Sequence, residues 1–206
     1  MAHALILGAS GISGWSLLNQ ARIYPTPTTF SRITGTTNRP FTLKQAHIPE
    51  DDRVKIASGI DFTESVEEVV RALKEKVPDI NTVTHVFFTA YIQTNHFETL
   101  KKVNTKLLEV AVRAIEAVSP RLKVVVLQTG GKGYGLEFPK EVGIKAPLKE
   151  TNPRIPEPWA SNIFYYTQQY DLSRSREVGF SEEIDTVEGY IKAWERMRDA
   201  KILPIL

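Results

Sequence analysis

Short apolar runs alternate with segments of helical period over residues 4–129. Five runs of strand length predict β-strands at residues 4–7, 30–37, 54–59, 84–90 and 123–129. Three intervening segments, with apolar residues every three or four positions, predict helices at residues 11–23, 63–77 and 97–118. Strands that alternate with helices imply right-handed crossovers and a parallel sheet. With a glycine-rich turn after the first strand, we expect an α/β fold: a Rossmann-type parallel sheet of order 3-2-1-4-5 with helices on both faces.

The remaining segments lack this alternation. Residues 39–53 contain prolines and several charges and are expected to form a loop. Residues 130–160 are rich in glycine and proline and follow the fifth strand, so they should lie over the carboxyl edge of the sheet, where loops make binding sites. Two further helices are predicted at 161–172 and 182–200, followed by a short apolar tail at 202–206.

Composition and charge exclude several classes of protein. The chain has 206 residues, 42% of them hydrophobic, which suits one globular domain. The net charge is +2 and the basic residues are interleaved with acidic ones, so we expect no nucleic-acid partner. No apolar run approaches the roughly 20 residues of a membrane span. There is no cysteine and the first residues do not resemble a secretory leader, so a cytoplasmic location is expected.

The turn after the first strand has the spacing Gly-x-x-Gly-x-x-Gly and opens a helix. Glycines permit a tight turn and close approach of the backbone to a pyrophosphate, and the helix N-terminus supplies amide donors. We predict a dinucleotide site; the alternative is plain turn geometry. The turn contributes the expected cofactor contacts Gly8, Ser10, Gly11, Ile12 and Gly14.

The end of the second strand indicates which nucleotide binds. NAD sites usually carry an acid there, whereas this chain has Asn38 and Arg39 and no acid. Arg39 could pair with a 2′-phosphate, which favours NADP(H), or it could be a solvated loop arginine. Asp61, after the third strand, could bind the adenine amino group or cap the following helix.

Three further motifs stand in order along the chain: Thr-His-Val-Phe-Phe-Thr-Ala at 84–90, Leu-Gln-Thr-Gly-Gly-Lys-Gly-Tyr at 127–134 and Phe-Tyr-Tyr at 164–166. With the glycine-rich turn, they resemble the progesterone 5β-reductase/iridoid synthase-like (PRISE) family of atypical short-chain dehydrogenases. The resemblance covers residues 3 to about 169. It implies an NADP(H)-binding enzyme with Lys132 and Tyr165 as catalytic residues. The strand ends within these motifs complete the expected cofactor contacts: Thr89, Ala90, Gln128 and Thr129.

The C-terminal part resembles the far end of the same family, at residues 171–180 and 193–204. The large block that the family carries between these parts would fall between Gln169 and Asp171. The resemblance therefore implies an internally deleted member, truncated after the tyrosine helix. We accordingly expect one NAD(P)-binding Rossmann-like domain over residues 1–206. It would consist of a Rossmann core at 1–169, which includes the active-site loop 130–160, and a C-terminal helical segment at 170–206.

The resemblance also implies a reaction. In this family hydride passes to the β-carbon of an enone or enal, and negative charge develops on the carbonyl oxygen. The hydroxyl of Tyr165 would stabilise that enolate, and the ammonium of Lys132 would favour the charge and lower the phenol pKa. Without the resemblance, Lys132 would be interpreted as a solvated loop lysine and Tyr165 as a helix residue that packs in the core.

Three functions stay open at this point. The first is an NADPH-dependent reductase of an activated alkene or carbonyl, acting on a small molecule. The second is a non-redox isomerase or cyclase that uses the same Tyr165 and Lys132, and the third is a non-catalytic nucleotide-binding remnant. The four histidines form no cluster with metal-ligand spacing, so no metal is expected. The fifth strand would present an apolar edge, which predicts a homodimer.

Overall fold

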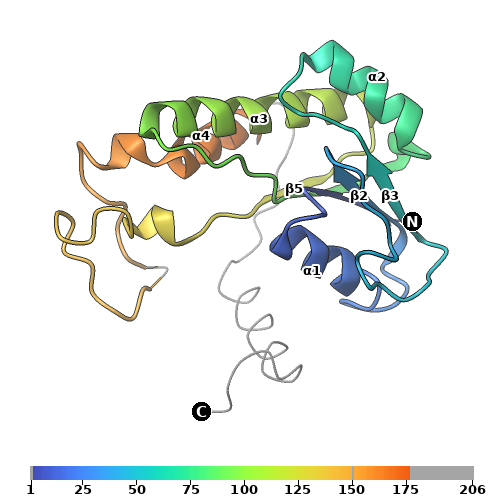
Figure 1. Ribbon diagram of the computed structural model, residues 1–206, viewed down its shortest axis with the longest axis horizontal. Coiled ribbons are helices and arrows are strands. Elements are labelled where there is room, and N and C mark those ends of the chain that lie inside the picture. The colour runs from blue at the N-terminus through green and yellow to red at the C-terminus, as the bar shows by residue number, and fades with distance from the viewer. Residues whose placement is uncertain (1, 150, 177–206) are drawn as a thin grey trace.

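A five-stranded parallel sheet forms the centre of the molecule (Figure 1). The structure is a computed structural model that describes residues 2–149 and 151–176. The strand order is β3-β2-β1-β4-β5, so the predicted topology is confirmed. The strands are β1 (Ala2–Leu7), β2 (Phe30–Thr37), β3 (Val54–Ser58), β4 (His85–Phe88) and β5 (Val124–Leu127). The helices are α1 (Ile12–Gln20), α2 (Val66–Lys76), α3 (Phe97–Val118) and α4 (Phe164–Arg176), with short 3-10 turns η1 (Ile80–Thr82), η2 (Gly131–Tyr134) and η3 (Ala160–Asn162).

Helices cover both faces of the sheet, as expected. On one face α2 and α3 pack against alternate residues of β1 and β4, among them Leu5 and Phe88. On the other face α1 and the loop after β2 cover Ala4, Ile6 and Ile33 (Figure 1). Because β1 is buried on both faces, its sequence is a continuous apolar run and does not alternate.

Helix ends differ from the predicted ends for local reasons. The helix predicted at 11–23 ends at Gln20, a few residues before Pro25, which disfavours helical backbone at the residue that precedes it. By contrast, α2 begins where the sequence indicates, since Ser65 and Glu68 form a reciprocal capping box. In α4, the helix continues without a break through Gln169 and Asp171, where we infer the deletion.

Some predictions fall beyond what the structure describes. The helix expected at 182–200 and the apolar tail at 202–206 lie outside the described residues. The division into core and C-terminal segment, and the deletion itself, stay predictions. Within the described residues no helix has the length and apolar character to cross a membrane.

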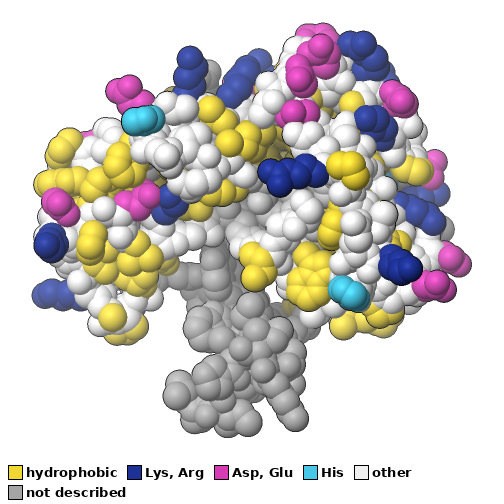
Figure 2. All heavy atoms as spheres, viewed as in Figure 1, with side chains coloured by type: hydrophobic (Ala, Val, Ile, Leu, Met, Phe, Trp, Pro, Cys, Tyr) yellow, Lys and Arg dark blue, Asp and Glu magenta, His cyan; other side chains and the backbone are white. Residues whose placement is uncertain are grey.

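One edge of the sheet is formed by β5, which pairs only with β4 among the described strands. Val125, Val126 and Leu127 are half-buried there, so part of the strand is open to solvent. The homodimer that would cover this edge stays a prediction. Lysine, arginine and acidic side chains are interspersed over the face seen in Figure 2, in agreement with the interleaved charges of the sequence.

His3 is a buried histidine at the start of the sheet, only 1% exposed. Its Nδ1 and Nε2 each lie 3.0 Å from a threonine hydroxyl, on Thr82 and Thr34 respectively. Burial and, to a lesser extent, the nearby charge of Arg32 together lower the pKa of His3 to about 4. The folded chain therefore holds this imidazole neutral at a pH where the unfolded chain has already protonated it.

This difference predicts a loss of stability in mild acid. The unfolded state binds a proton near pH 6.5 and the folded state only near pH 4, so stability falls as the pH drops through this window. The full loss is about 3 kcal/mol. Urea unfolding at pH 7.5, 6 and 5 should show the fall in the wild-type chain and in the exposed-site control His96→Gln, but not in His3→Gln. The same pH slope in His3→Gln as in wild type would contradict the prediction.

Candidate active site

The turn between β1 and α1 leaves no room for side chains at two of its glycines. Gly8 has a φ of 85°, and its amide and that of Ala9 both donate to the carbonyl of Thr36 at 3.1 and 3.0 Å. A Cβ atom on Gly14 would lie 2.2 Å from the carbonyl oxygen of Gly8. The helix is thereby held directly against the end of β1, over the carboxyl edge of the sheet.

The N-terminus of α1 fits the phosphates of a dinucleotide. Its N-cap is Gly11, which provides no side-chain cap, and the first turn carries no acid. The first-turn amides therefore have no side-chain acceptor among the described residues, as an anion site requires. A Cβ on Gly11 would meet nothing nearer than 3.4 Å, so that side of the turn is open to a ligand.

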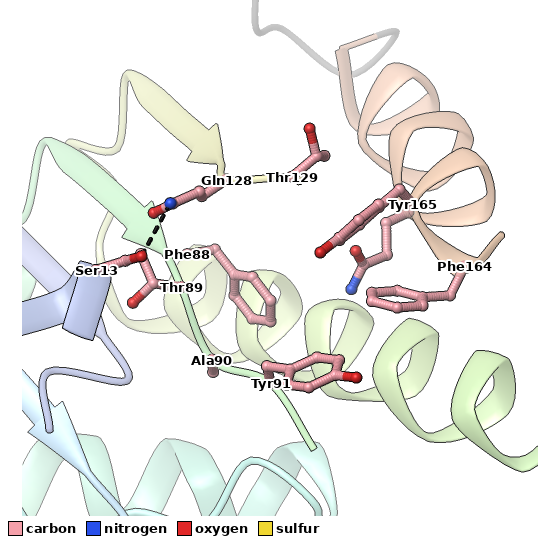
Figure 3. A pocket seen from close by; sticks show the side chains of 10 residues that line it. Ser13, Phe88, Thr89, Ala90, Tyr91, Gln128, Thr129, Phe164 and Tyr165 are labelled. Atoms are coloured by element: carbon pink, nitrogen blue, oxygen red, sulfur yellow. Dashed lines mark hydrogen bonds between the residues drawn. The ribbon is translucent and has the colours of Figure 1, made fainter. Parts of the chain in front are cut away.

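A pocket of about 160 Å³ lies where β4 and β5 end (Figure 3). It brings together Ser13 from α1, Thr89 and Ala90 after β4, Gln128 and Thr129 after β5, and Tyr165 from α4. The amide of Gln128 donates to the hydroxyl of Ser13 at 3.0 Å, which links the glycine-rich turn to β5 (Figure 3). Four predicted cofactor contacts and the predicted catalytic tyrosine thus line one pocket.

Two adjacent tyrosines on α4 have different surroundings. The hydroxyl of Tyr166 donates to the carbonyl of Gly133 at 2.7 Å and accepts from the amide of Ile155 at 3.1 Å. It therefore ties the loop after β5 to α4. The hydroxyl of Tyr165 instead lies beside Gly130, where a Cβ would approach it to 3.4 Å, and the residue lines the pocket. The geometry favours Tyr165 over Tyr166 as the residue that faces a ligand.

Lys132 lies in η2 and pairs with an acid that the sequence did not single out. Its ammonium is 2.6 Å from Oε1 of Glu137 and 5.9 Å from the ring centroid of Tyr91. Burial lowers the pKa of Lys132, but the hydrogen bond and charge of Glu137 outweigh it and raise the pKa above its ordinary value. The lysine is therefore firmly cationic.

The pKa of Tyr165 differs from the expectation drawn from the resemblance. Burial raises it, and the nearby Tyr91 raises it further, while the charge of Lys132 lowers it without reversing the shift. The expected net lowering by Lys132 is not found, because burial and Tyr91 outweigh it and Glu137 also raises the pKa. Tyr165 is a protonated phenol at neutral pH, suited to donate a hydrogen bond.

Residues at the ends of β2 and β3 meet on the surface. Asp61 accepts hydrogen bonds from the amide and hydroxyl of Thr63 at 2.9 and 2.7 Å, and from the side-chain amide of Asn38 at 2.9 Å. Burial raises the pKa of Asp61, but these hydrogen bonds keep it below its ordinary value. Asp61 therefore shapes the turn before α2, whose cap is Ser65, and its role toward adenine stays a prediction.

Arg39 is exposed beside Asn38, and its carbonyl accepts a hydrogen bond from the hydroxyl of Thr37 at 2.7 Å. Within the described chain its guanidinium has no ion-pair partner.

A second, more open hollow of about 330 Å³ is lined by Ser10, Gly11 and Ile12 of the turn and by residues of the loop at 41–47. Three of the five predicted cofactor contacts of the turn thus border this hollow, whereas Gly8 and Gly14 line neither it nor the first pocket. No group of His, Asp and Glu suited to a metal ion occurs among the residues that the structure describes.

Sequence reasoning missed several residues of the site, among them Tyr91, Glu137 and Gln168. Tyr91 directly follows the motif at 84–90, so its position was a usable signal. Gln168 stands three residues after Tyr165 on the same helix and therefore on nearly the same face. Glu137 gave no such signal, because its contact with Lys132 depends on the path of an irregular loop.

Comparison with protein families and curated proteins finds related sequences. The model of the PRISE-like Rossmann-fold domain matches residues 4–177. The short chain dehydrogenase ausT of Aspergillus calidoustus is 40% identical over 172 residues, covering 80% of this chain and 42% of that protein. The short chain dehydrogenase sirQ of Leptosphaeria maculans is 37% identical over 201 residues, covering 93% and 51%. The (S)-8-oxocitronellyl enol synthase of Nepeta racemosa is 31% identical over 169 residues, covering 81% and 40%.

Solved structures share the fold at low sequence identity. Gre2 from Candida albicans superposes with a TM-score of 0.56 at 12% identity, over 85% of this chain and 53% of that one. A short-chain dehydrogenase/reductase superfamily protein from Agrobacterium tumefaciens with bound NAD gives 0.53 at 16% identity, over 88% and 47%. The chain spans about half the length, or less, of the curated relatives described above. The chain belongs to the PRISE-like Rossmann-fold family, and two of the three curated relatives described above are named short chain dehydrogenases.

Proposed function

We propose that this chain carries the cofactor site and the tyrosine–lysine pair of an NADP(H)-dependent reductase that acts on an enone or enal. The observation that carries the proposal is the shared pocket: Tyr165 lines the same cavity as Ser13, Thr89 and Gln128, which belong to the turn and strand ends of a Rossmann cofactor site. The naming of several relatives as short-chain dehydrogenases supports a nicotinamide cofactor. When bound, the reduced nicotinamide supplies a hydride to the β-carbon of the substrate.

Tyr165 would act as a hydrogen-bond donor to the substrate carbonyl. Burial raises its pKa, so the phenol keeps its proton at neutral pH and can donate it to an oxygen that gains negative charge. Relatives include a protein named an enol synthase, and an enolate is the species that such a donor would stabilise.

Lys132 would supply positive charge at the edge of the same site. Its hydrogen bond to Glu137 holds the ammonium in place, and its raised pKa keeps it charged throughout the neutral range. The pair would thus favour an anionic substrate oxygen while leaving the phenol of Tyr165 protonated.

The first test compares the two adjacent tyrosines. Tyr165→Phe should lower the rate of enal-dependent NADPH oxidation by about 100-fold or more, since it removes the donor to the developing charge. Its stability should change little. Tyr166→Phe should retain more of the activity but lose about 1–2 kcal/mol of stability, because the Gly133 carbonyl and the Ile155 amide lose their partner.

The absorbance of NADPH measures the rate, and urea unfolding measures the stability of each variant. The opposite ranking of the two variants in rate would contradict the assignment of Tyr165. Conversion of an enal without NADPH, abolished by Tyr165→Phe, would replace the reductase with the non-redox isomerase or cyclase.

The second test concerns nucleotide preference. Arg39 is exposed beside the end of β2, and a charge-assisted pair with a 2′-phosphate would favour NADPH over NADH. Arg39→Ala should weaken NADPH binding by about 10- to 100-fold and leave NADH binding nearly unchanged. Lys44→Ala removes one exposed charge from the same loop and should affect neither strongly. Calorimetric titration measures the two affinities. An equal loss of affinity for both nucleotides in Arg39→Ala, or no loss for either, would exclude the role of Arg39.

A further inference from the structure

The pocket contains a buried acceptor that no protein group satisfies. Gln168 is 1% exposed and lines the pocket together with Tyr165 and Phe164. Its Nε2 donates to the carbonyl of Asn104 at 2.8 Å. Its Oε1 is buried and has no hydrogen-bond partner among the described residues.

The surrounding contacts fix the orientation of this amide. If the amide were turned over, its oxygen would face the carbonyl oxygen of Asn104, and two acceptors would meet. The group at Asn104 is a main-chain carbonyl, which has no proton to donate, so the turned amide would lose the hydrogen bond and gain none there. The oxygen of Gln168 is therefore held in the pocket wall without a partner.

An acceptor in this state needs a donor from outside the described chain. Nearly all buried polar groups in native proteins are paired, and an unpaired one bears its full desolvation cost. In a pocket such a donor belongs to a ligand, to an ordered water or to a part of the chain outside the described residues. A ligand with a hydrogen-bond donor would offset the desolvation cost of the Gln168 oxygen. A ligand without a donor would exclude water from this oxygen and leave it unpaired.

The position on α4 associates this acceptor with the substrate and not with the nucleotide. Figure 3 shows Ser13, Thr89 and Gln128 gathered on one side of the pocket and Tyr165, Phe164 and Tyr91 on the other. Gln168 belongs to the same helix as Tyr165, one turn further on, and so lies on the α4 side.

We propose that Oε1 of Gln168 accepts a hydrogen bond from a hydroxyl or N–H group of the substrate. The substrate class is then an unsaturated carbonyl compound that carries a hydroxyl or amide donor besides its carbonyl group. The carbonyl part of this description rests on the proposed function; the donor part rests on Gln168 alone.

The test measures binding of matched ligands to the chain without cofactor. The probes are 2-octenal, its derivatives with a hydroxyl at carbon 4, 5 or 6, and the corresponding methyl ethers, with dissociation constants from ligand-observed NMR. At least one hydroxy-enal should bind about tenfold or more tightly than both its ether and the parent enal. Gln168→Met should reduce that preference to about twofold or less, which loss of packing alone would not do.

Gln169→Met is the matched control. The Oε1 of that neighbouring glutamine accepts from Arg154 at 2.9 Å on the exposed side of α4, so the preference should persist. The ether comparison uses the wild-type chain and decides the matter even if Gln168→Met does not fold. Equal binding of hydroxy-enals and ethers would overturn the proposal in favour of an ordered water. A preference that survives in Gln168→Met, or a loss of NADP⁺ binding in that variant, would also overturn it.

Turnover with NADPH is measured separately on the same compounds. A Gln168-dependent preference in binding, with no reduction of any enal, would contradict the proposed reductase and leave the donor site standing. Reduction of enals without that preference would contradict the donor site at Gln168 and leave the proposed reductase standing.

Discussion

The contact between Gly8 and Gly14 is the constraint on which the site depends. The carbonyl oxygen of Gly8 occupies the space that any side chain at residue 14 would need, since a Cβ there would lie 2.2 Å away. Only with this contact does α1 start directly over the carboxyl edge of the sheet, next to the boundary between β1 and β4. A second close approach, of Gly35 to Ala9, seats the same turn against β2: a Cβ on Gly35 would lie 2.6 Å from the Cβ of Ala9.

The opposite wall of the pocket is built by hydrogen bonds and ion pairs. Gln168 fastens α4 to the carbonyl of Asn104 on α3, and Tyr166 fastens the loop after β5 to α4. These contacts place Tyr165 at the pocket. The ion pair of Lys132 with Glu137 keeps positive charge near the phenol without ionising it. The site combines a protonated donor with a fixed cation, which suits stabilisation of an oxygen that becomes negative.

Much of the fold follows from sequence patterns, and less of the site does. The apolar runs and the glycine turn predict the five strands and their order because parallel crossovers permit few topologies. Positions directly after strands, such as Thr89 and Gln128, could be assigned to the pocket, since the carboxyl ends of parallel strands meet there. The partners of side chains in irregular segments could not: Glu137 reaches Lys132, and Asp61 bonds Thr63 and Asn38, through loop geometry that has no period.

The most direct measurement of the central claim is nucleotide binding by Gly11→Ala. In the structure a Cβ on Gly11 would be 3.4 Å from the nearest atom, an ordinary contact, so the variant should fold with the stability of wild type. A dinucleotide whose pyrophosphate lies on this turn would meet that methyl group. The account predicts one NADP⁺ bound per wild-type chain and an affinity about tenfold or more weaker in Gly11→Ala, at unchanged thermal stability. Equal affinity for NADP⁺ in the two proteins would contradict it.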